Sequence, residues 1–410
     1  MLKKTALLLF VSGLAFIATA QKNKFITTSG THLIAPGGKQ FLMKGTNLGN
    51  WLVPEGYMFK FKHTSSPRLI QEMLLQLSGP DEANLFWKRY LENYITKEDI
   101  HYLASIGMNS IRIPFHYKLF TDEEYMGGRG TARGFAIMDK LISWCRQENL
   151  YLLLDMHCAP GGQTGDNIDD SWGTPFLFES EKSKEQTIRI WKQIASRYRN
   201  EPVILGYDLL NEPIATYFDT ARYNKHLEPL YKRITAAIRS VDQNHLIFYG
   251  GAQWNSNFRV FGKPFDKKAV YSFHKYWTAA TQEVIQPYLD FSNKYQVPLH
   301  CGETGENTDE WVQEFRQTLD KNEVGWHYWP YKKMDNSRGI VSFNTPEHFK
   351  EVIAFADTAR NNFELIRKAK PGNEAEIKKA LEDFLTNCLF RNCYPNAGYI
   401  RALDFKVKEN

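Results

Sequence analysis

The chain has 410 residues, 14% of them aromatic, and a formal net charge of +5 at neutral pH. That length suits one large α/β domain or two ordinary domains. The positive charge is small and scattered, which argues against nucleic acid as a partner.

The first 20 residues have the features of a secretory signal peptide. Lys3 and Lys4 give a positive start, an apolar run covers residues 6–17, and small residues end the segment at Ala20. We therefore expect cleavage near Ala20, a mature chain that begins at Gln21, and a secreted or periplasmic location. No later apolar run has the length of a transmembrane helix, so we expect an exported monomer without a transmembrane segment.

After an N-terminal hairpin over residues 25–44, short apolar runs alternate with stretches of helical periodicity. The runs predict eight strands, at residues 41–47, 110–114, 150–157, 203–212, 245–250, 270–274, 299–303 and 325–329. The periodic stretches predict helices at residues 83–106, 135–149, 183–199, 220–241, 282–295, 309–319 and 346–367. Only the run at 245–250 lacks a clear helix after it.

Strands that alternate with helices along a chain form a parallel sheet. Eight such units predict a closed (β/α)8 TIM barrel, with long loop insertions at residues 50–80 and 159–180. The alternative is an open doubly wound sheet, but GTNLGNW after the first strand lacks the GxGxxG spacing of its phosphate turn. We assign residues 21–370 to the barrel domain. Residues 371–410 form a C-terminal extension whose helix, at 373–386, is expected to pack on the barrel as a cap.

The five cysteines include one pair that is close in sequence. Cys388 and Cys393 are the only pair that we interpret as a candidate disulfide. Because the number of cysteines is odd, at least one thiol stays unpaired in a monomer. No spacing of cysteine and histidine resembles a zinc site. We expect no metal and no other cofactor.

The run VILGYDLLNEP, residues 203–213, ends in a carboxylate. Pro213 cannot donate to a strand ladder, so we expect the strand to stop at Glu212. Parallel α/β folds place their chemistry at such strand ends. The run VPLHCGE, residues 297–303, ends in a second carboxylate, Glu303, in the same context. The sequence therefore predicts two carboxylates at one end of the barrel.

The other predicted strand ends also carry polar or aromatic side chains: Asn47, Arg112, His157, Asn211, Tyr249, His274, Tyr276, and Trp326 or Trp329. Each has a structural explanation by itself, but a purely structural barrel would not need such residues at every strand end. Two carboxylates without a metal or phosphate motif suit glycoside hydrolysis, which needs one protonated acid and one ionised carboxylate. On this hypothesis Arg112 and Tyr276 keep Glu303 ionised. Asn211 then binds the hydroxyl next to the reacting carbon, and Trp329 forms the floor under that sugar.

Seven motifs, spread over residues 40–332, resemble glycoside hydrolase family 5: GTNLGNWL, NSIRIP, LLLDMH, LLNEP, FHKYW, GET and HYWPYKK. The resemblance implies a retaining (β/α)8 enzyme in which Glu212 is the acid/base and Glu303 the nucleophile. It also implies a substrate-binding shell made of Arg112, His157, Asn211, His274, Tyr276 and Trp329.

A narrower resemblance, in NLGNWLVPEG, YITKEDIHYLASIGMNSIRIPFHY and HCAPGGQTGDN, is to the exo-β-1,3-glucanase branch. It implies that Glu55 binds a terminal glucose and that a β-glucan polysaccharide or oligosaccharide is the substrate, cut by a β-1,3-glucanase or β-glucosidase activity. The sugar-binding acid of the loop over residues 162–172 is open between Asp169 and Asp170. Tyr331 stands where this branch more usually has a second tryptophan.

Other functions remain as alternatives at this point. An endo-β-1,4-glucanase or a mannanase would use the same two carboxylates. A non-catalytic glycan-binding protein on a decayed barrel would be favoured by the loss of either glutamate, and both are present. A metal-dependent barrel hydrolase would need ligands at a spacing such as HxH on an early strand, which the sequence lacks.

Overall fold

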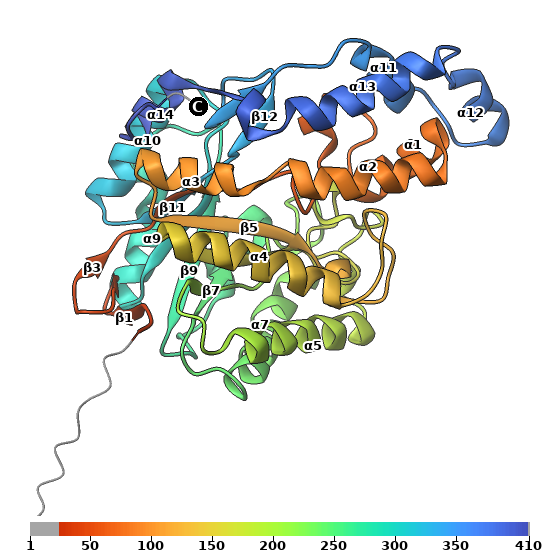
Figure 1. Ribbon diagram of the computed structural model, residues 1–410. Coiled ribbons are helices and arrows are strands. Elements are labelled where there is room, and N and C mark those ends of the chain that lie inside the picture. The colour runs from red at the N-terminus through yellow and green to blue at the C-terminus, as the bar shows by residue number, and fades with distance from the viewer. Residues whose placement is uncertain (1–23, 409–410) are drawn as a thin grey trace, which may run out of the picture.

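Eight parallel strands close into a barrel in the computed structural model, which describes residues 24–408 (Figure 1). They are β4 (Lys44–Asn47), β5 (Ser110–His116), β6 (Tyr151–Cys158), β7 (Ile204–Asp208), β8 (Leu246–Gly250), β9 (Ala269–Lys275), β10 (Leu299–Thr304) and β11 (Gly325–Tyr328). Each pairs with the next strand along the chain, and β11 closes the ring against β4. The predicted (β/α)8 barrel is confirmed. The predicted signal peptide lies outside the described residues.

Amphipathic helices cover the outside of the barrel: α3 (Lys97–Ile106), α4 (Ala132–Glu148), α5 (Glu181–Tyr198), α7 (Leu227–Arg239), α9 (Gln282–Tyr295) and α10 (Asp309–Lys321) (Figure 1). In α7 the buried side chains include Leu230, Ile234 and Ile238, and this four-residue spacing gives the helix one apolar face. The segment after β8 holds the short α8 (Ala252–Asn255) and one 3-10 turn at Phe258–Val260, in line with its missing helical pattern. Within the described part of the chain, no helix is both long and apolar enough to cross a membrane.

Three stretches that were predicted as single helices are broken. Residues 83–106 form α2 (Pro80–Asn93) and α3, because Thr96 begins a new helix with a capping box. The Asp99 carboxylate accepts the backbone N–H of Thr96 at 2.7 Å. Residues 346–367 likewise divide into α11 (Phe349–Asp357) and α12 (Phe363–Ala369), where Asn362 caps the second helix. In addition, residues 220–241 hold a short α6 (Thr220–Tyr223) ahead of α7, and the first long insertion contains α1 (Pro67–Ser78).

The N-terminal hairpin is a three-stranded antiparallel sheet of β1 (Thr27–Ser29), β2 (His32–Ile34) and β3 (Gln40–Phe41). Leu33 of β2 and Ile26, which directly precedes β1, belong to one buried cluster with barrel residues such as Leu153, Leu205 and Val270. The hairpin therefore adds apolar contacts to the barrel strands, in a cluster separate from the main core.

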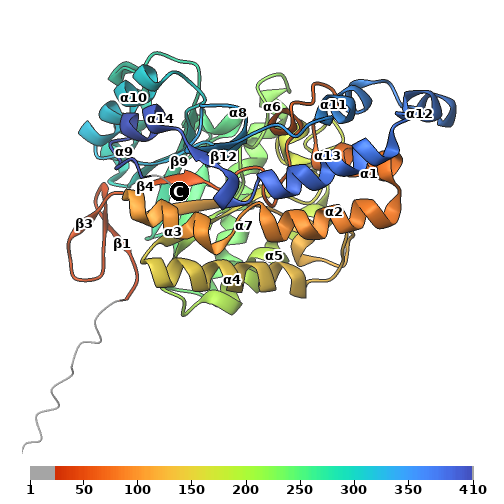
Figure 2. The same cartoon turned by 45° about the horizontal axis from the view of Figure 1, so that its top comes forward.

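The chain after the barrel forms elements that the sequence did not predict. A second small sheet joins β12 (Lys332–Met334), β13 (Val341–Phe343) and β14 (Tyr394–Pro395), so it ties the C-terminal extension to the segment that follows β11. The expected helix is α13 (Glu374–Asn387), which runs beside α2, and α14 (Ala397–Ala402) packs near α10 (Figure 2). The extension is thus in contact with the barrel through both a sheet and two helices.

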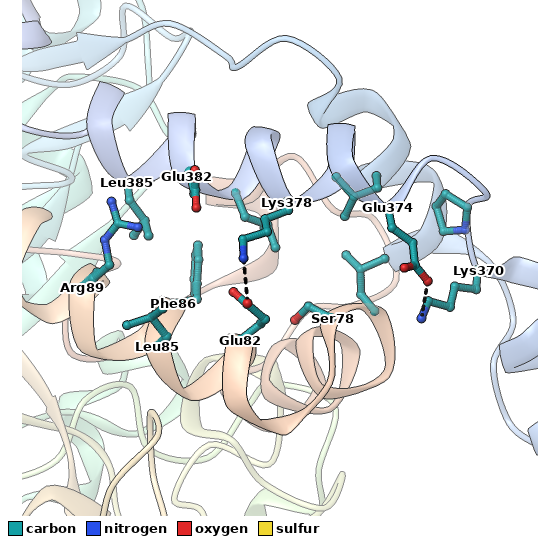
Figure 3. A pocket seen from close by; sticks show the side chains of 14 residues that line it. Ser78, Glu82, Leu85, Phe86, Arg89, Lys370, Glu374, Lys378, Glu382 and Leu385 are labelled. Carbon is teal, nitrogen blue, oxygen red and sulfur yellow. Dashed lines mark hydrogen bonds and ion pairs between the residues drawn. The ribbon is translucent and has the colours of Figure 1, made fainter.

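A cavity of about 250 Å³ lies where α13 meets α1 and α2 (Figure 3). Phe86 and Leu385 contribute apolar walls, and the ion pair between Lys378 and Glu82, at 2.8 Å, crosses its rim. Beside it, the Phe384 ring stacks on the Phe59 ring at 5.2 Å between centroids, so aromatic packing attaches α13 to the first loop of the barrel.

The candidate disulfide between Cys388 and Cys393 is not formed. Both thiols are buried and donate to backbone carbonyls: Cys388 Sγ lies 3.6 Å from the Leu385 carbonyl oxygen, and Cys393 Sγ lies 3.4 Å from that of Leu389. Burial raises the pKa of Cys388 to about 12 and that of Cys393 to about 11. The Cys388 thiol thus donates to a carbonyl in the last turn of α13, and the Cys393 thiol donates to one just after this helix.

Candidate active site

A cavity of about 520 Å³ opens at the C-terminal ends of the barrel strands. Seven of the nine predicted site residues line it: Glu55, His157, Glu212, His274, Tyr276, Glu303 and Trp329. The other two, Arg112 and Asn211, are fully buried and hydrogen-bonded to each other. The structure therefore brings all nine predicted residues into one site.

Arg112 on β5 lies at the centre of a buried polar cluster. Its Nη1 donates to Glu303 Oε1 at 2.7 Å, and its Nη2 donates to Asn211 Oδ1 at 2.8 Å. The guanidinium also contacts two aspartates: Nε donates to Asp208 at 2.9 Å, and Nη2 lies 3.0 Å from Asp155. Burial by itself would lower the pKa of Arg112, but the surrounding carboxylates reverse this and raise it. The guanidinium remains a cation and orients every group that it touches.

Asp155 and Asp208 face each other across neighbouring strands, as register partners of β6 and β7. Burial raises the pKa of each carboxyl to about 7, although Arg112 lowers both. One guanidinium is thus shared among Asp155, Asp208 and Glu303. The cluster holds Glu303 in place by charge-assisted hydrogen bonds from a rigid part of the barrel.

Glu303 has a donor on each carboxylate oxygen. Arg112 serves Oε1, and the Tyr276 hydroxyl donates to Oε2 at 3.1 Å. A carboxylate held in this way is fixed in orientation and presents its oxygens to the cavity, as attack on a sugar carbon requires.

Glu212 does not lie in a strand, which corrects the predicted end of the central strand. β7 ends at Asp208, and the chain then bends so that the backbone N–H of Asn211 donates to the Met156 carbonyl at 3.1 Å. Glu212 itself has a φ of 45°, in the left-handed region. Its backbone is held by Asn255 Oδ1, at 3.1 Å from N, and by the Thr164 hydroxyl, at 2.8 Å from O. A strained, hydrogen-bonded turn thus aims this carboxyl into the cavity.

Burial raises the pKa of Glu212 to about 7, although His157 and Arg112 lower it. Its Oε1 lies 2.9 Å from Nδ1 of His274. Burial also lowers the pKa of His274 to about 3, so this imidazole is neutral at ordinary pH. Glu212 can therefore keep a proton near neutral pH, which a general acid needs.

The imidazole of His157 links the two sides of the site. Its Nδ1 lies 2.8 Å from Asp155 Oδ2, and its Nε2 lies 3.3 Å from the amide nitrogen of Asn211. Because the Asn211 oxygen already accepts from Arg112, this amide donates to His157 Nε2, and Nδ1 carries the ring proton. Burial lowers the pKa of His157 to about 4, so the ring is neutral. Trp329 stacks on the same ring with centroids 5.7 Å apart and 9° between the planes.

One end of the cavity carries an unsatisfied carboxylate. Glu55 is 4% exposed, and its Oε1 has no hydrogen-bond partner. Burial raises the pKa of Glu55, and the charges of Glu303, Glu306 and Glu212 raise it further. A buried acceptor without a partner costs free energy, so this oxygen is suited to a donor supplied by a ligand.

Asp169 and Asp170, the two candidates for the sugar-binding acid of their loop, both accept backbone N–H groups. Asp169 accepts backbone N–H groups of its own loop, such as that of Thr164 at 2.6 Å, and Asp170 accepts from the backbone N–H of Arg68 at 2.8 Å. Neither lines the cavity; their loop contributes Asn167 and Ile168 instead. Tyr331 points into the core, where its hydroxyl donates to Asp99 at 2.7 Å.

Sequence reasoning missed several residues of the site. Asp155 was detectable, because it precedes His157 by two positions and so shares its face of the strand. The additional cavity residues lie on loops or short helices: Tyr57, Asn167, Ile168, Trp254, Ser256, Trp277 and Glu306. Asn167 and Trp277 end two of the quoted motifs, HCAPGGQTGDN and FHKYW, but were not singled out.

Two groups of side chains have ligand atoms close enough for a metal ion: Asp155 with His157 and Glu303, and Glu212 with His274 and Glu303. Both depend on Glu303, whose Oε1 already accepts from Arg112 at 2.7 Å. A cation there would face the guanidinium charge, so the residues do not suit a metal site. The expected absence of a cofactor stays a prediction.

In the second of these groups, one carboxylate oxygen of Glu212 and one of Glu303 lie within 4.8 Å of each other. A (β/α)8 barrel with such a pair, one carboxyl poised to hold a proton and one bound by an arginine, defines the class of protein as a glycoside hydrolase. Residues 73–335 match the sequence model of the family described as Cellulase (glycosyl hydrolase family 5), and the chain belongs to that family.

Curated relatives carry several activities in their names. The chain is 31% identical over 270 residues to a β-xylosidase from Phanerodontia chrysosporium, covering 65% of this chain and 54% of that protein. It is 26% identical over 316 residues to endoglucanase C from Acetivibrio thermocellus, covering 62% and 89%. It is 27% identical over 224 residues to the probable glucan 1,3-β-glucosidase A of Aspergillus clavatus, covering 52% of each chain. The chain thus spans about half the length of two of these three relatives.

Among solved structures, the chain is similar to the rutinosidase from Aspergillus niger, with a TM-score of 0.59 and 20% identity. The match covers 73% of this chain and 92% of that chain. At this identity the likeness concerns the fold.

Proposed function

We propose that the protein is an exported, retaining β-glycosidase that acts on β-glucans or their oligosaccharides from the non-reducing end, as a β-1,3-glucanase or β-glucosidase. The observation that carries this proposal is the pair of Glu212 and Glu303 in one cavity, with oxygens within 4.8 Å. Retaining glycosidases hold their carboxyl groups roughly 5 Å apart, whereas inverting enzymes leave room for a water between them.

In the proposed mechanism Glu303 attacks the anomeric carbon while Glu212 gives its proton to the leaving oxygen. The bond from the sugar to the leaving group breaks, and an ester bond from the sugar to Glu303 forms. Glu212, now ionised, then takes a proton from water, which attacks the same carbon and releases Glu303. Asn211 is placed to bind the 2-hydroxyl, because its amide lies beside both His157 and the Arg112–Glu303 pair.

Attack from the chain end is supported by Glu55 and by the name of one relative. Two hydroxyls of a terminal sugar could donate to the Glu55 carboxylate, whose Oε1 has no hydrogen-bond partner. The relative named glucan 1,3-β-glucosidase A supports the β-1,3-glucan linkage.

The second candidate function is internal cleavage by an endoglucanase. It is favoured by the match to endoglucanase C, which covers 89% of that protein. An open cleft would bind sugars on both sides of Glu303, and Glu55 would then contact an inner sugar of the chain.

Product analysis decides between these two functions. Incubation with laminarin, cellulose derivatives and mannan, with products sized over time, should show steady glucose release from laminarin and little early loss of viscosity. A rapid fall in viscosity with mixed oligosaccharides would instead establish endo attack. NMR of the first product should show the β-anomer, and an initial α-anomer would overturn the retaining mechanism.

The export and the monomeric state are proposals from the sequence. Expression in a bacterial host with analysis of the secreted and periplasmic fractions should yield a chain that begins at Gln21, and gel filtration should give the mass of one chain. A mature protein that keeps residues 1–20 would contradict the export signal.

A further inference from the structure

A fourth carboxylate, Glu306, lines the same cavity three residues after the proposed nucleophile. Its φ is 49°, and the preceding Gly305 has a φ of 118°. A Cβ at Gly305 would lie 2.5 Å from the Tyr399 hydroxyl and 2.8 Å from the Trp329 carbonyl oxygen. Only glycine fits this approach, so the turn holds Glu306 in a fixed place beside Trp329.

Lys333 is the ion-pair partner of Glu306 and does not line the cavity. Side chains alternate along β12, and the neighbouring Lys332 is fully buried, 2.7 Å from Asp99. Lys333 is 8% exposed, and its ammonium lies 4.7 Å from the centre of the Tyr57 ring. The Tyr57 hydroxyl in turn accepts from the indole N–H of Trp329 at 2.7 Å. A cation of this kind fixes the Glu306 carboxylate without entering the cavity.

The orientation of a bound sugar follows from the groups on either side of Glu303, if the proposed function is right. Oε1 of Glu303 faces Arg112, which also binds Asn211, and Oε2 faces Tyr276. In a pyranose ring the 2-hydroxyl and the ring oxygen lie on the two sides of the anomeric carbon. With the 2-hydroxyl at Asn211, the ring oxygen lies on the side of Tyr276.

In this orientation Glu306 lies beside C5, the ring carbon that the ring oxygen joins to the anomeric carbon. Glu306 lines the same cavity as Tyr276 and Glu55, and the Gly305 turn that carries it packs against the Trp329 carbonyl oxygen. Between a ring oxygen at Tyr276 and a far edge at Glu55, a hexopyranose carries its exocyclic hydroxymethyl group. A pentopyranose such as xylose has only hydrogen at this position.

We propose that Glu306, positioned by Lys333, accepts a hydrogen bond from the exocyclic hydroxyl of a terminal hexose and so makes the site select hexosides over pentosides. This inference rests on the proposed function, because it assumes a sugar above Glu303. Glu306 is the residue that contacts the substrate, and Lys333 is a positioning residue.

The test compares two substrates that differ only in the hydroxymethyl group: 4-nitrophenyl β-D-glucoside and 4-nitrophenyl β-D-xyloside. In the parent enzyme kcat/KM should favour the glucoside. Glu306→Gln should reduce this preference about 10-fold or more, because a charged acceptor is replaced by a neutral one. Lys333→Met should reduce it in the same direction, and Lys333→Arg should restore most of it. Glu310→Gln, an exposed carboxylate at the start of α10, is the matched control and should leave the ratio unchanged.

Binding separates this inference from the proposed function, because it needs no hydrolysis. Calorimetry with 1-deoxynojirimycin and with the imino-xylitol that lacks its hydroxymethyl group should show at least 10-fold tighter binding of the former to the parent. Glu306→Gln should bring the two affinities together. Equal affinities in the parent, or an unchanged ratio in Glu306→Gln, would overturn the role of Glu306. An enzyme that discriminates between the two ligands but hydrolyses neither aryl glycoside would overturn the proposed function alone.

Discussion

The candidate active site has two parts that are built differently. The polar cluster under the cavity, made of Arg112, Asp155, Asp208 and Asn211, is fully buried, and its first three residues lie within strands. The cavity wall, made of Glu55, Tyr57 and Glu306, comes from the segments that follow β4 and β10 and contains the left-handed turn at Glu306. In the cluster Arg112 bonds to every neighbour, whereas in the wall Glu55 keeps an oxygen without a partner.

This difference indicates a division of labour. Strand ladders hold charges rigidly, which suits groups that must keep one arrangement through the reaction. Loops tolerate changes in length and sequence, which suits groups that select a substrate. We therefore expect substitutions at the carboxylates held by the strands to affect the reaction itself. Substitutions in the wall should affect the choice of sugar.

The largest expected effect is at Glu303. Glu303→Ala removes the proposed nucleophile and should lower kcat on an aryl β-glucoside by on the order of 10⁴-fold or more. Added azide should restore part of the turnover of an activated aryl glycoside and give a glycosyl azide of inverted configuration. A variant that keeps one tenth of the parent's activity would contradict the role of Glu303.

Glu212→Gln should have the next largest effect, and the effect should depend on the leaving group. Hydrolysis of laminarin oligosaccharides should fall by about 10²–10⁴-fold, whereas an aryl glycoside with a weakly basic leaving oxygen should react through its first step nearly as before. Equal losses on both substrates would count against Glu212 as the acid.

The pH profile gives an independent measure of the same residue. Because burial raises the pKa of Glu212 to about 7, the carboxyl is protonated and active below this pH. Above it the acid form is lost, so kcat/KM on the glucan should fall about tenfold per pH unit. In Glu212→Gln this alkaline fall should disappear. Its persistence would assign the ionisation to another group.

Glu55→Ala tests the cavity wall and should lower kcat/KM on a terminal glucoside by on the order of 10²-fold, since it removes an acceptor for two sugar hydroxyls. The loss should be small on a soluble glucan if attack is internal. Comparing aryl glucoside and carboxymethyl-glucan rates for the parent and the variant makes this distinction. A fully active Glu55→Ala variant would remove the support for exo attack.

The smallest expected effect is at Asp155, which acts through His157. Asp155→Asn replaces the acceptor of the His157 Nδ1 proton and one of the carboxylates around Arg112, and should lower kcat/KM about 10-fold. Asp139→Asn breaks a surface pair with Arg197 and is the matched control, with an expected change below about twofold. Thermal melts of both variants separate loss of folding from loss of activity. Equal effects of the two substitutions would contradict a positioning role for Asp155.

Much of the fold was predictable because strand and helix patterns are local. The apolar runs predicted the eight barrel strands, and residues near their C-terminal ends, such as His157 and Glu303, meet at one site because parallel strands share an edge. Strand order therefore placed Glu212 and Glu303 at one end of the barrel, whereas Glu55 was a candidate only through the family resemblance. The helix break at Thr96 was missed, although its capping box is written in the sequence.

What remained undecided depends on contacts between distant segments. Asp169 and Asp170 are equivalent as sequence, and only the folded loop shows that both bind backbone groups. The thiols of Cys388 and Cys393 are close in sequence, but the end of α13 directs them to carbonyl oxygens. Glu306 has no motif around it; its place in the cavity wall comes from Lys333 and from a turn packed against Tyr399. Periodicity and strand order thus determined the barrel and its two carboxylates. Loop direction, which depends on long-range packing and hydrogen bonds, was decided by the tertiary structure alone.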